Sequence, residues 1–201
     1  QHSSEANRLP QSHPNSLGAA STPRSSQTYN ELENISYKHT RVIKLRAEQL
    51  EMNRIVAFNK NDPKSMTFDL LRTHVLQKME ENGWRTLAIT SPTPEAGKTV
   101  VAINLAMSIA QQTNKTAMLV DFDLRRPKIG AYLGIPMEKS LNDLLDGTAE
   151  LADMLVNPDM PRLVVLPTKI PVRNSAETLS SKKIADLIKD MRKRYESRIV
   201  I

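Results

Sequence analysis

The sequence contains no cysteine among its 201 residues, which excludes disulfide bonds, thiolate nucleophiles and cysteine-ligated metal sites. It also contains no run of about 20 consecutive apolar residues, the length that a membrane-spanning helix needs. Its first residues lack the basic and then apolar layout of a secretory signal. From these absences we expect an intracellular protein.

Charge of one sign is only in modest excess, with a formal net charge of +6. Such an excess permits attraction to nucleic acid or anionic lipid. The lysines and arginines are spread along the chain, however, with one concentration between Lys189 and Arg198 on a predicted helix and its exit. We interpret that concentration as a solvated helix face, and we expect no nucleic-acid partner.

The N-terminal part differs in composition from the rest. Residues 1 to about 30 are rich in Ser, Pro, Asn and Gln and show almost no apolar periodicity. Such a segment cannot bury enough apolar area to offset the entropy lost on ordering. We predict a disordered tail or tether over residues 1–45 and a folded domain over residues 46–201, with a partly ordered arm from Ser36 to Phe58 where they meet.

The domain alternates predicted strands with predicted helices. Short apolar runs predict strands at 86–90, 116–122, 163–166 and 198–201, and apolar periodicity predicts helices at 65–79, 98–112, 128–133, 141–145 and 175–195. This alternation predicts an α/β fold of the P-loop NTPase type, a doubly wound, mostly parallel sheet flanked by helices. Because an apolar strand rarely ends a domain, we expect further parts of the fold to follow Ile201.

The stretch from Ser91 to Thr99, SPTPEAGKT, lies between a predicted strand and a predicted buried helix. That is the context of a phosphate loop, in which backbone N–H groups and the positive end of a helix bind phosphate oxygens. In such loops a lysine reaches the β- and γ-phosphates and a hydroxyl ligates Mg²⁺. Lys98 and Thr99 fit those positions, whereas Pro92 stands where the motif has glycine.

A second polar stretch follows the predicted strand 116–122. Ligands of open parallel sheets bind beyond the carboxyl ends of the strands, and the spacing of Asp121 and Asp123 places both carboxylates on one side if the strand persists that far. We predict that Lys98, Asp121 and Asp123 are catalytic and that Thr99, Asp121 and Asp123 hold the metal. The predicted nucleotide-binding residues are Pro94, Glu95, Ala96, Gly97, Lys98, Thr99, Val100 and Arg125.

SPTPEAGKT followed by MLVDFDLRRP resembles the bacterial tyrosine kinases that regulate capsule and exopolysaccharide export. Those enzymes use a Walker A loop, an acidic Walker A′ motif and a Walker B motif in place of the eukaryotic kinase fold. Walker A resembles 91–99, Walker A′ resembles 118–127, and Arg198–Ile201 is similar to the first half of the Walker B strand. The similarity runs from about Ser65 to Ile201.

The resemblance implies an ATP-dependent protein tyrosine autokinase with Mg²⁺ as its metal. It further implies phosphorylation between copies in a homo-oligomer and a membrane polysaccharide co-polymerase as activator. Through that partner the domain would lie in the cytoplasm at the inner face of the membrane. Lys98 would stabilise charge on the transferring phosphoryl group, and Asp121 would position or deprotonate an acceptor tyrosine.

Besides Pro92 in the phosphate loop, the sequence departs from the family in two further places. The family assembles into rings through a Glu-x-x-Arg-x-x-Arg helix, of which only Arg72 is matched, since Met66 and Asp69 occupy the other positions. The tyrosine-rich tail of the family is also missing. Tyr29 and Tyr37, in or near the tail and arm, are the candidate acceptors.

Two other functions fit the same motifs. One is a partition or positioning ATPase of the related deviant-Walker class, although these usually carry an additional lysine early in the loop and residues 91–96 contain none. The other is a non-catalytic, nucleotide-binding regulator of a polysaccharide co-polymerase.

Overall fold

The computed structural model describes residues 40–111, 114–193 and 197–201. The strands are β1 Arg41–Val42, β2 Thr116–Val120, β3 Val156–Asn157, β4 Leu163–Leu166 and β5 Arg198–Val200. The helices are α2 Ala47–Met52, α3 Ser65–Glu81, α4 Lys98–Ala110, α5 Ile129–Leu133, α6 Leu141–Asp146, α7 Leu151–Met154, α8 Ser175–Leu179 and α9 Lys182–Lys193. The tail predicted before residue 40 lies outside the described residues.

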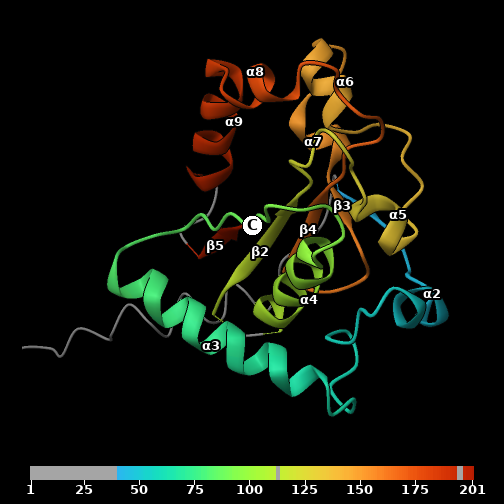
Figure 1. Cartoon of the computed structure of the whole chain (residues 1–201), viewed down its shortest axis with the longest axis vertical. Helices are drawn as coiled ribbons and strands as arrows, with labels where there is room; N and C mark the ends of the chain where they lie inside the picture. The colour runs from blue at the N-terminus through green and yellow to red at the C-terminus, as the bar shows by residue number, and fades with distance from the viewer. Residues whose placement is uncertain (1–39, 112–113, 194–196) are drawn as a thin grey trace, which may run out of the picture.

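The described strands form one mixed, mostly parallel sheet in the order β1-β3-β4-β2-β5. The central strand β2 runs parallel to both of its neighbours, pairing Val120 with Leu166 of β4 and Met118 with Val200 of β5. The pair β3–β4 is antiparallel. The carboxyl ends of β2, β4 and β5 therefore meet at one edge of the sheet (Figure 1), the edge at which ligands bind in open α/β sheets.

Helices cover both faces of the sheet, which explains why β2 is apolar at every position after Thr116. Successive side chains of a strand point to opposite faces. Ala117 and Leu119 pack in the core on the α3–α4 side, whereas Met118 and Val120 pack in a second core with Leu151 of α7 and Met191 of α9. The predicted doubly wound α/β fold is confirmed.

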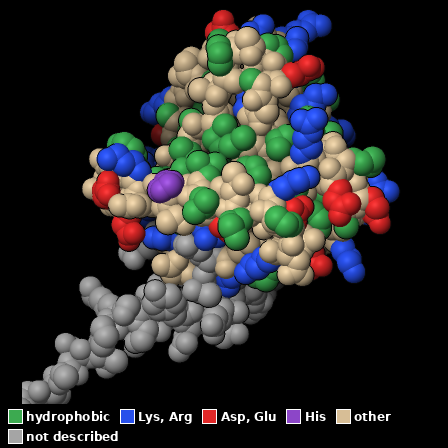
Figure 2. Space-filling model, turned by 60° about the horizontal axis from the view of Figure 1, so that its bottom comes forward, with side chains coloured by type: hydrophobic (Ala, Val, Ile, Leu, Met, Phe, Trp, Pro, Cys, Tyr) green, Lys and Arg blue, Asp and Glu red, His purple; other side chains and the backbone are tan. Residues whose placement is uncertain are grey.

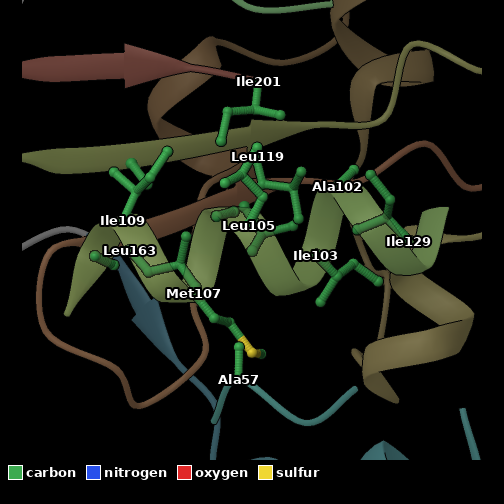
Figure 3. Close-up of a cluster of buried hydrophobic side chains, with 14 of the residues drawn as sticks. Ala57, Ala102, Ile103, Leu105, Met107, Ile109, Leu119, Ile129, Leu163 and Ile201 are labelled. Carbon is green, nitrogen blue, oxygen red and sulfur yellow. The ribbon is translucent and has the colours of Figure 1, made fainter. Parts of the chain in front are cut away.

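Helix α4 is enclosed on two sides. Figure 3 shows Leu105 and Ile109 directed towards the sheet, while Ile103 and Met107 point away from it and Met107 reaches Ala57 of the arm. On that arm side Asn104, which is fully buried, accepts hydrogen bonds from the N–H groups of residues 56 and 57 and donates to the carbonyl groups of residues 54 and 100. The arm is thus an integral part of the fold that holds the helix behind the phosphate loop.

Two features of the N-terminal half correct the sequence analysis. The sequence places Arg41 and Val42 in the tail, but they form β1 and pair with β3, so the ordered part begins before residue 46. The predicted strand 86–90 is reduced to a single bridge between Thr86 and Val200. Because β5 ends at Val200, only the start of that segment has a strand beside it.

The predicted helix 175–195 is two helices. The helix is interrupted at Ser180 and Ser181. The Ser181 hydroxyl accepts a hydrogen bond from the Ile184 N–H group and so caps α9. Serine competes with the helical backbone for hydrogen bonds and favours such caps. The break lets α8 and α9 run in different directions above the sheet (Figure 1).

The outer side of α3 is partly apolar. Met66 and Leu70 are more than half exposed, and Figure 2, which brings the lower side of the molecule forward, shows hydrophobic side chains scattered among charged ones on this face. Arg72, the one matched residue of the ring motif, makes its contacts within the chain: it forms an ion pair with Asp69 at 2.7 Å and donates a hydrogen bond to Ser108 of α4. Among the helices of the described residues, none has the length and apolarity to cross a membrane.

Candidate functional site

The phosphate loop enters α4 through two residues in left-handed conformation. Gly97 has a φ of 85° and Glu95 a φ of 61°, a region that favours glycine. A Cβ atom placed on Gly97 would meet no atom within 4 Å. The loop backbone is therefore open to close approach by a ligand at this point.

The N-terminus of α4 is open as well. The first hydrogen bond of the helix runs from the Val101 N–H group to the carbonyl group of Gly97, the N-cap residue, at 3.0 Å. In the described chain, no group accepts a hydrogen bond from the N–H groups of Lys98, Thr99 or Val100. Free N–H groups at the positive end of a helix form a ready anion site, and phosphate oxygens are the anions that suit this one.

Lys98 already contacts an anion within the chain. Its Nζ atom lies 2.9 Å from a carboxylate oxygen of Asp123, and both side chains are about three-quarters buried. Burial alone would raise the pKa of Asp123, but the hydrogen bond from Lys98 and the N–H group of Arg126 outweigh it and lower that pKa. Asp123 is thus held ionised next to the lysine.

Asp121 has a different environment, because it is almost completely buried. Its carboxylate accepts hydrogen bonds from the N–H groups of Asp123, Lys128 and Ile129 at 2.9–3.2 Å. Burial raises the pKa of Asp121 to about 6, against the lowering effect of those hydrogen bonds. Asp121 therefore fixes the turn that carries Asp123 and begins α5.

The strand predicted over 116–122 is shorter, since β2 ends at Val120, so the condition for placing both carboxylates on one side is not met. The Phe122 N–H group donates a hydrogen bond to the Val120 carbonyl group. This tight turn ends the pattern of a strand, in which successive side chains point to opposite faces. The two carboxylates are consequently placed by the turn: Asp121 points into the backbone of residues 123–129, and Asp123 points to Lys98.

A cavity of about 810 Å³ opens between the phosphate loop and the carboxyl end of β2. Of the predicted site residues, it is lined by Pro94, Lys98, Thr99, Asp121, Asp123 and Arg125. Glu95, Ala96, Gly97 and Val100 lie in the loop and the first helical turn but do not line it. The roles assigned to all of these residues stay predictions.

The sequence analysis missed the apolar wall of this cavity, which includes Leu179 and Ile188. Both fit the apolar face of the helices 175–195, so the pattern assigned them to the core. Leu179 is 40% exposed, and no signal in the sequence distinguishes a cavity wall from a packed face. Arg126, the neighbour of Arg125, also lines the cavity.

The donor set fits a magnesium-bound nucleotide. In the described part of the chain no three His, Cys, Asp or Glu side chains converge on a metal position. Mg²⁺ in nucleotide sites, however, usually takes one or two protein oxygens together with phosphates and waters. The Thr99 hydroxyl and the ionised Asp123 line the same cavity and are suitable oxygen ligands.

No protein-family profile matches the chain, but the two similar proteins that follow are both named tyrosine-protein kinases. Tyrosine-protein kinase ptk of Acinetobacter johnsonii is 30% identical over 114 residues, which are 57% of this chain and 15% of that protein. Tyrosine-protein kinase CpsD of Streptococcus agalactiae is 35% identical over 111 residues, 54% of this chain and 47% of CpsD. The chain is a relative of the bacterial tyrosine kinases.

Solved structures agree with this relationship. The VpsO kinase domain superposes with a TM-score of 0.59 at 29% identity, covering 68% of each chain. The fold is therefore that of a P-loop kinase domain. The chain spans less than half the length of the two curated tyrosine kinases compared above.

Proposed function

We propose that the chain binds Mg²⁺-ATP and serves as the nucleotide-binding part of a protein tyrosine autokinase that regulates capsule or exopolysaccharide synthesis. The observation that carries the proposal is the open end of α4, where three free N–H groups lie beside the Lys98 ammonium group and the ionised Asp123. The curated relatives, which are named tyrosine-protein kinases, supply the reaction.

In this proposal each polar side chain at the cavity has a role. Lys98 would bind the β- and γ-phosphates, and the N–H groups of residues 98–100 would bind phosphate oxygens at the helix end. Thr99 and Asp123 would hold Mg²⁺, and the metal would supply positive charge against the charge that develops on the transferred group. Arg125 or Arg126, at the cavity wall, adds a further counter-charge.

Asp121 suits a positioning role better than that of a general base. Its Oδ2 atom accepts two backbone hydrogen bonds and its Oδ1 atom accepts one, so only Oδ1 could accept a further hydrogen bond from the hydroxyl that a base deprotonates. Asp121 keeps Asp123 in place beside Lys98. Positioning of the acceptor tyrosine then falls to groups nearer the cavity mouth.

The remaining parts of the proposal rest on the resemblance of the motifs. They are phosphorylation between copies of the chain, activation by a membrane polysaccharide co-polymerase, and a cytoplasmic position at the membrane through that partner. Tyr29 and Tyr37, the candidate acceptors, lie outside the described residues.

Isothermal titration calorimetry with Mg²⁺-ATP, combined with detection of phosphotyrosine on the purified protein, tests the function. Lys98→Met should lower phosphotyrosine formation by roughly a thousandfold, because the lysine stabilises charge in the transition state. Lys60→Met removes an exposed lysine between the arm and α3 and should change neither readout. Undiminished phosphorylation by Lys98→Met would refute the assignment.

The same assay separates the two other functions. ATP hydrolysis without phosphotyrosine, accelerated by DNA, would select the partition ATPase. Binding of Mg²⁺-ATP without turnover would select the non-catalytic regulator.

A further inference from the structure

Two loops at the carboxyl edge of the sheet bring five basic side chains to one region. Residues 124–128 follow β2 and residues 168–174 follow β4 (Figure 1). The Val172 N–H group donates to the Leu124 carbonyl group at 2.7 Å, and the Thr168 hydroxyl donates to the Asp121 carbonyl group at 2.6 Å. The loops therefore lie side by side. We call their basic residues the cationic rim: Arg125, Arg126, Lys128, Lys169 and Arg173.

The charge of the cationic rim is not balanced within the two loops, which contain no acidic residue. All five side chains are exposed, and none of them forms an ion pair with another described residue. Lys169 contributes to the lowered pKa of the nearby Asp143, though less than the Ser140 N–H group does. By contrast, Lys139 and Arg41 are paired with carboxylates.

The backbone beneath the rim is fixed. Asn142 of α6 accepts hydrogen bonds from the N–H groups of Lys169 and Ile170 and donates to the Ile170 carbonyl group, all at 2.9–3.1 Å. On the other loop, Asp121 accepts from the N–H group of Lys128 and Asp123 from that of Arg126. A partner would meet basic side chains on a preformed backbone, which lowers the entropy cost of binding.

The rim extends beyond what a nucleotide needs. Arg125 and Arg126 line the cavity together with Lys98, whereas Lys169 and Arg173 do not. The outer two residues thus extend the positive surface away from the phosphate site. Ile170, which lies between them in the sequence, is 57% exposed and offers an apolar contact beside the basic residues.

We propose that the cationic rim binds an acidic peptide segment whose tyrosine enters the cavity mouth as phosphoryl acceptor. This inference rests on the proposed kinase function. Carboxylates on either side of the tyrosine complement the exposed lysine and arginine side chains, and Ile170 contacts the apolar part of the segment. Complementary charges of this kind steer encounter and fix register.

The test is fluorescence anisotropy of two labelled peptides, Glu-Glu-Tyr-Glu-Glu and Gln-Gln-Tyr-Gln-Gln, with the purified protein at low salt. The acidic peptide should bind at least about fivefold more tightly, because exposed ion pairs contribute up to about 1 kcal/mol each. Its affinity should fall as salt is added. The double variant Lys169→Ala/Arg173→Ala should weaken acidic-peptide binding about fivefold and leave the neutral peptide unchanged.

The matched control is Lys60→Ala/Lys64→Ala, which removes the same charge from two exposed lysines between the arm and α3 and should leave peptide binding as it is. Equal affinity for the two peptides, or full affinity in the rim variant, would overturn the proposal. So would binding to phosphatidylglycerol vesicles, lost in the rim variant, without any preference between the peptides, since the rim would then be a lipid surface.

Calorimetry with Mg²⁺-ATP on the same proteins keeps this proposal separate from the kinase function. Both double variants should bind Mg²⁺-ATP as the unmodified protein does. If ATP binds and phosphotyrosine forms while peptide preference is absent, only the role of the cationic rim fails. If no protein binds ATP although the acidic peptide is preferred, the kinase function fails and the role of the rim as an acceptor site falls with it.

Discussion

The phosphate loop and the turn 121–129, which flank the cavity, differ in how many of their backbone N–H groups are hydrogen-bonded within the chain. In the phosphate loop, residues 91–97, the one side-chain hydrogen bond described within the loop joins Ser91 to the Thr93 carbonyl group, and the N–H groups that follow it have no partner in the described chain. In the turn 121–129, the carboxylates of Asp121 and Asp123 accept four backbone hydrogen bonds.

The difference shows which loop is completed by a ligand and which is complete already. Unpaired N–H groups are costly when buried and are tolerated where water or a ligand can reach them. The phosphate loop is mostly exposed, whereas Asp121 is buried. Substitutions in the turn should therefore act on stability, and substitutions in the loop on nucleotide binding.

The largest expected effect on stability comes from removing the acceptor in the turn. Asp121→Ala leaves three backbone N–H groups, those of residues 123, 128 and 129, without their acceptor in a buried site. We expect a loss of about 3 kcal/mol in the free energy of unfolding at neutral pH, measured by urea titration.

Asp123→Ala is the matched control, because it also replaces an aspartate with alanine, only two positions further along the chain. Asp123 is about one-quarter exposed, so its ion pair with Lys98 is screened, and we expect a loss below about 1 kcal/mol. Equal destabilisation by the two substitutions would show that the burial of Asp121 does not make it more important for the stability of the turn than the partly exposed Asp123.

The pH dependence of stability should sharpen the same contrast. Burial raises the pKa of Asp121 from 3.8 to about 6 in the folded protein, so the folded state binds its proton more tightly than the unfolded state. The resulting stabilisation is complete below the unfolded pKa and is lost as the pH rises through about 6. Between about pH 4.5 and 7 this residue should lower the free energy of unfolding by about 2 kcal/mol.

Urea titrations across that range check the prediction against Asp121→Asn, which cannot titrate and should show a flatter profile. Asp123 has a lowered pKa, so its contribution is lost only at lower pH, as the pH falls through its folded pKa. An unchanged slope in Asp121→Asn would mean that another group titrates in this window.

The same turn shows how far sequence reasoning reaches. The apolar runs predicted β2 and β4, and the Gly-Lys-Thr stretch between a strand-like segment and an apolar helix predicted the start of α4 at Lys98. These features are set by local pattern and by burial on both faces of a sheet. Asp121 is buried and Asp123 contacts Lys98 because the chain turns at Phe122. The spacing of the two aspartates in the sequence does not predict this turn.

Features that depend on distant partners were missed for a similar reason. The strand β1 and the hydrogen bonds of Asn104 to the arm join segments about 50 or more residues apart. The apolar residues of the arm do not follow one helical or strand spacing, so they do not predict its structure, and it is ordered by what it packs against. Serine at position 181 could have been recognised as a cap, because Ser is favoured at helix starts.

The smallest expected effect concerns the strained position in the phosphate loop. Glu95 adopts a φ of 61°, which costs a non-glycine residue about 1 kcal/mol and costs glycine almost nothing. Part of that gain is offset because glycine loses more freedom on folding, so Glu95→Gly should stabilise the protein by about 0.5 kcal/mol. Glu95→Gln keeps the strain, removes the same charge and should leave stability unchanged in urea titration. A gain in stability for both variants would trace the effect to the carboxylate near the open helix end, whereas a gain for glycine alone would show that this loop holds its backbone under strain before any ligand binds.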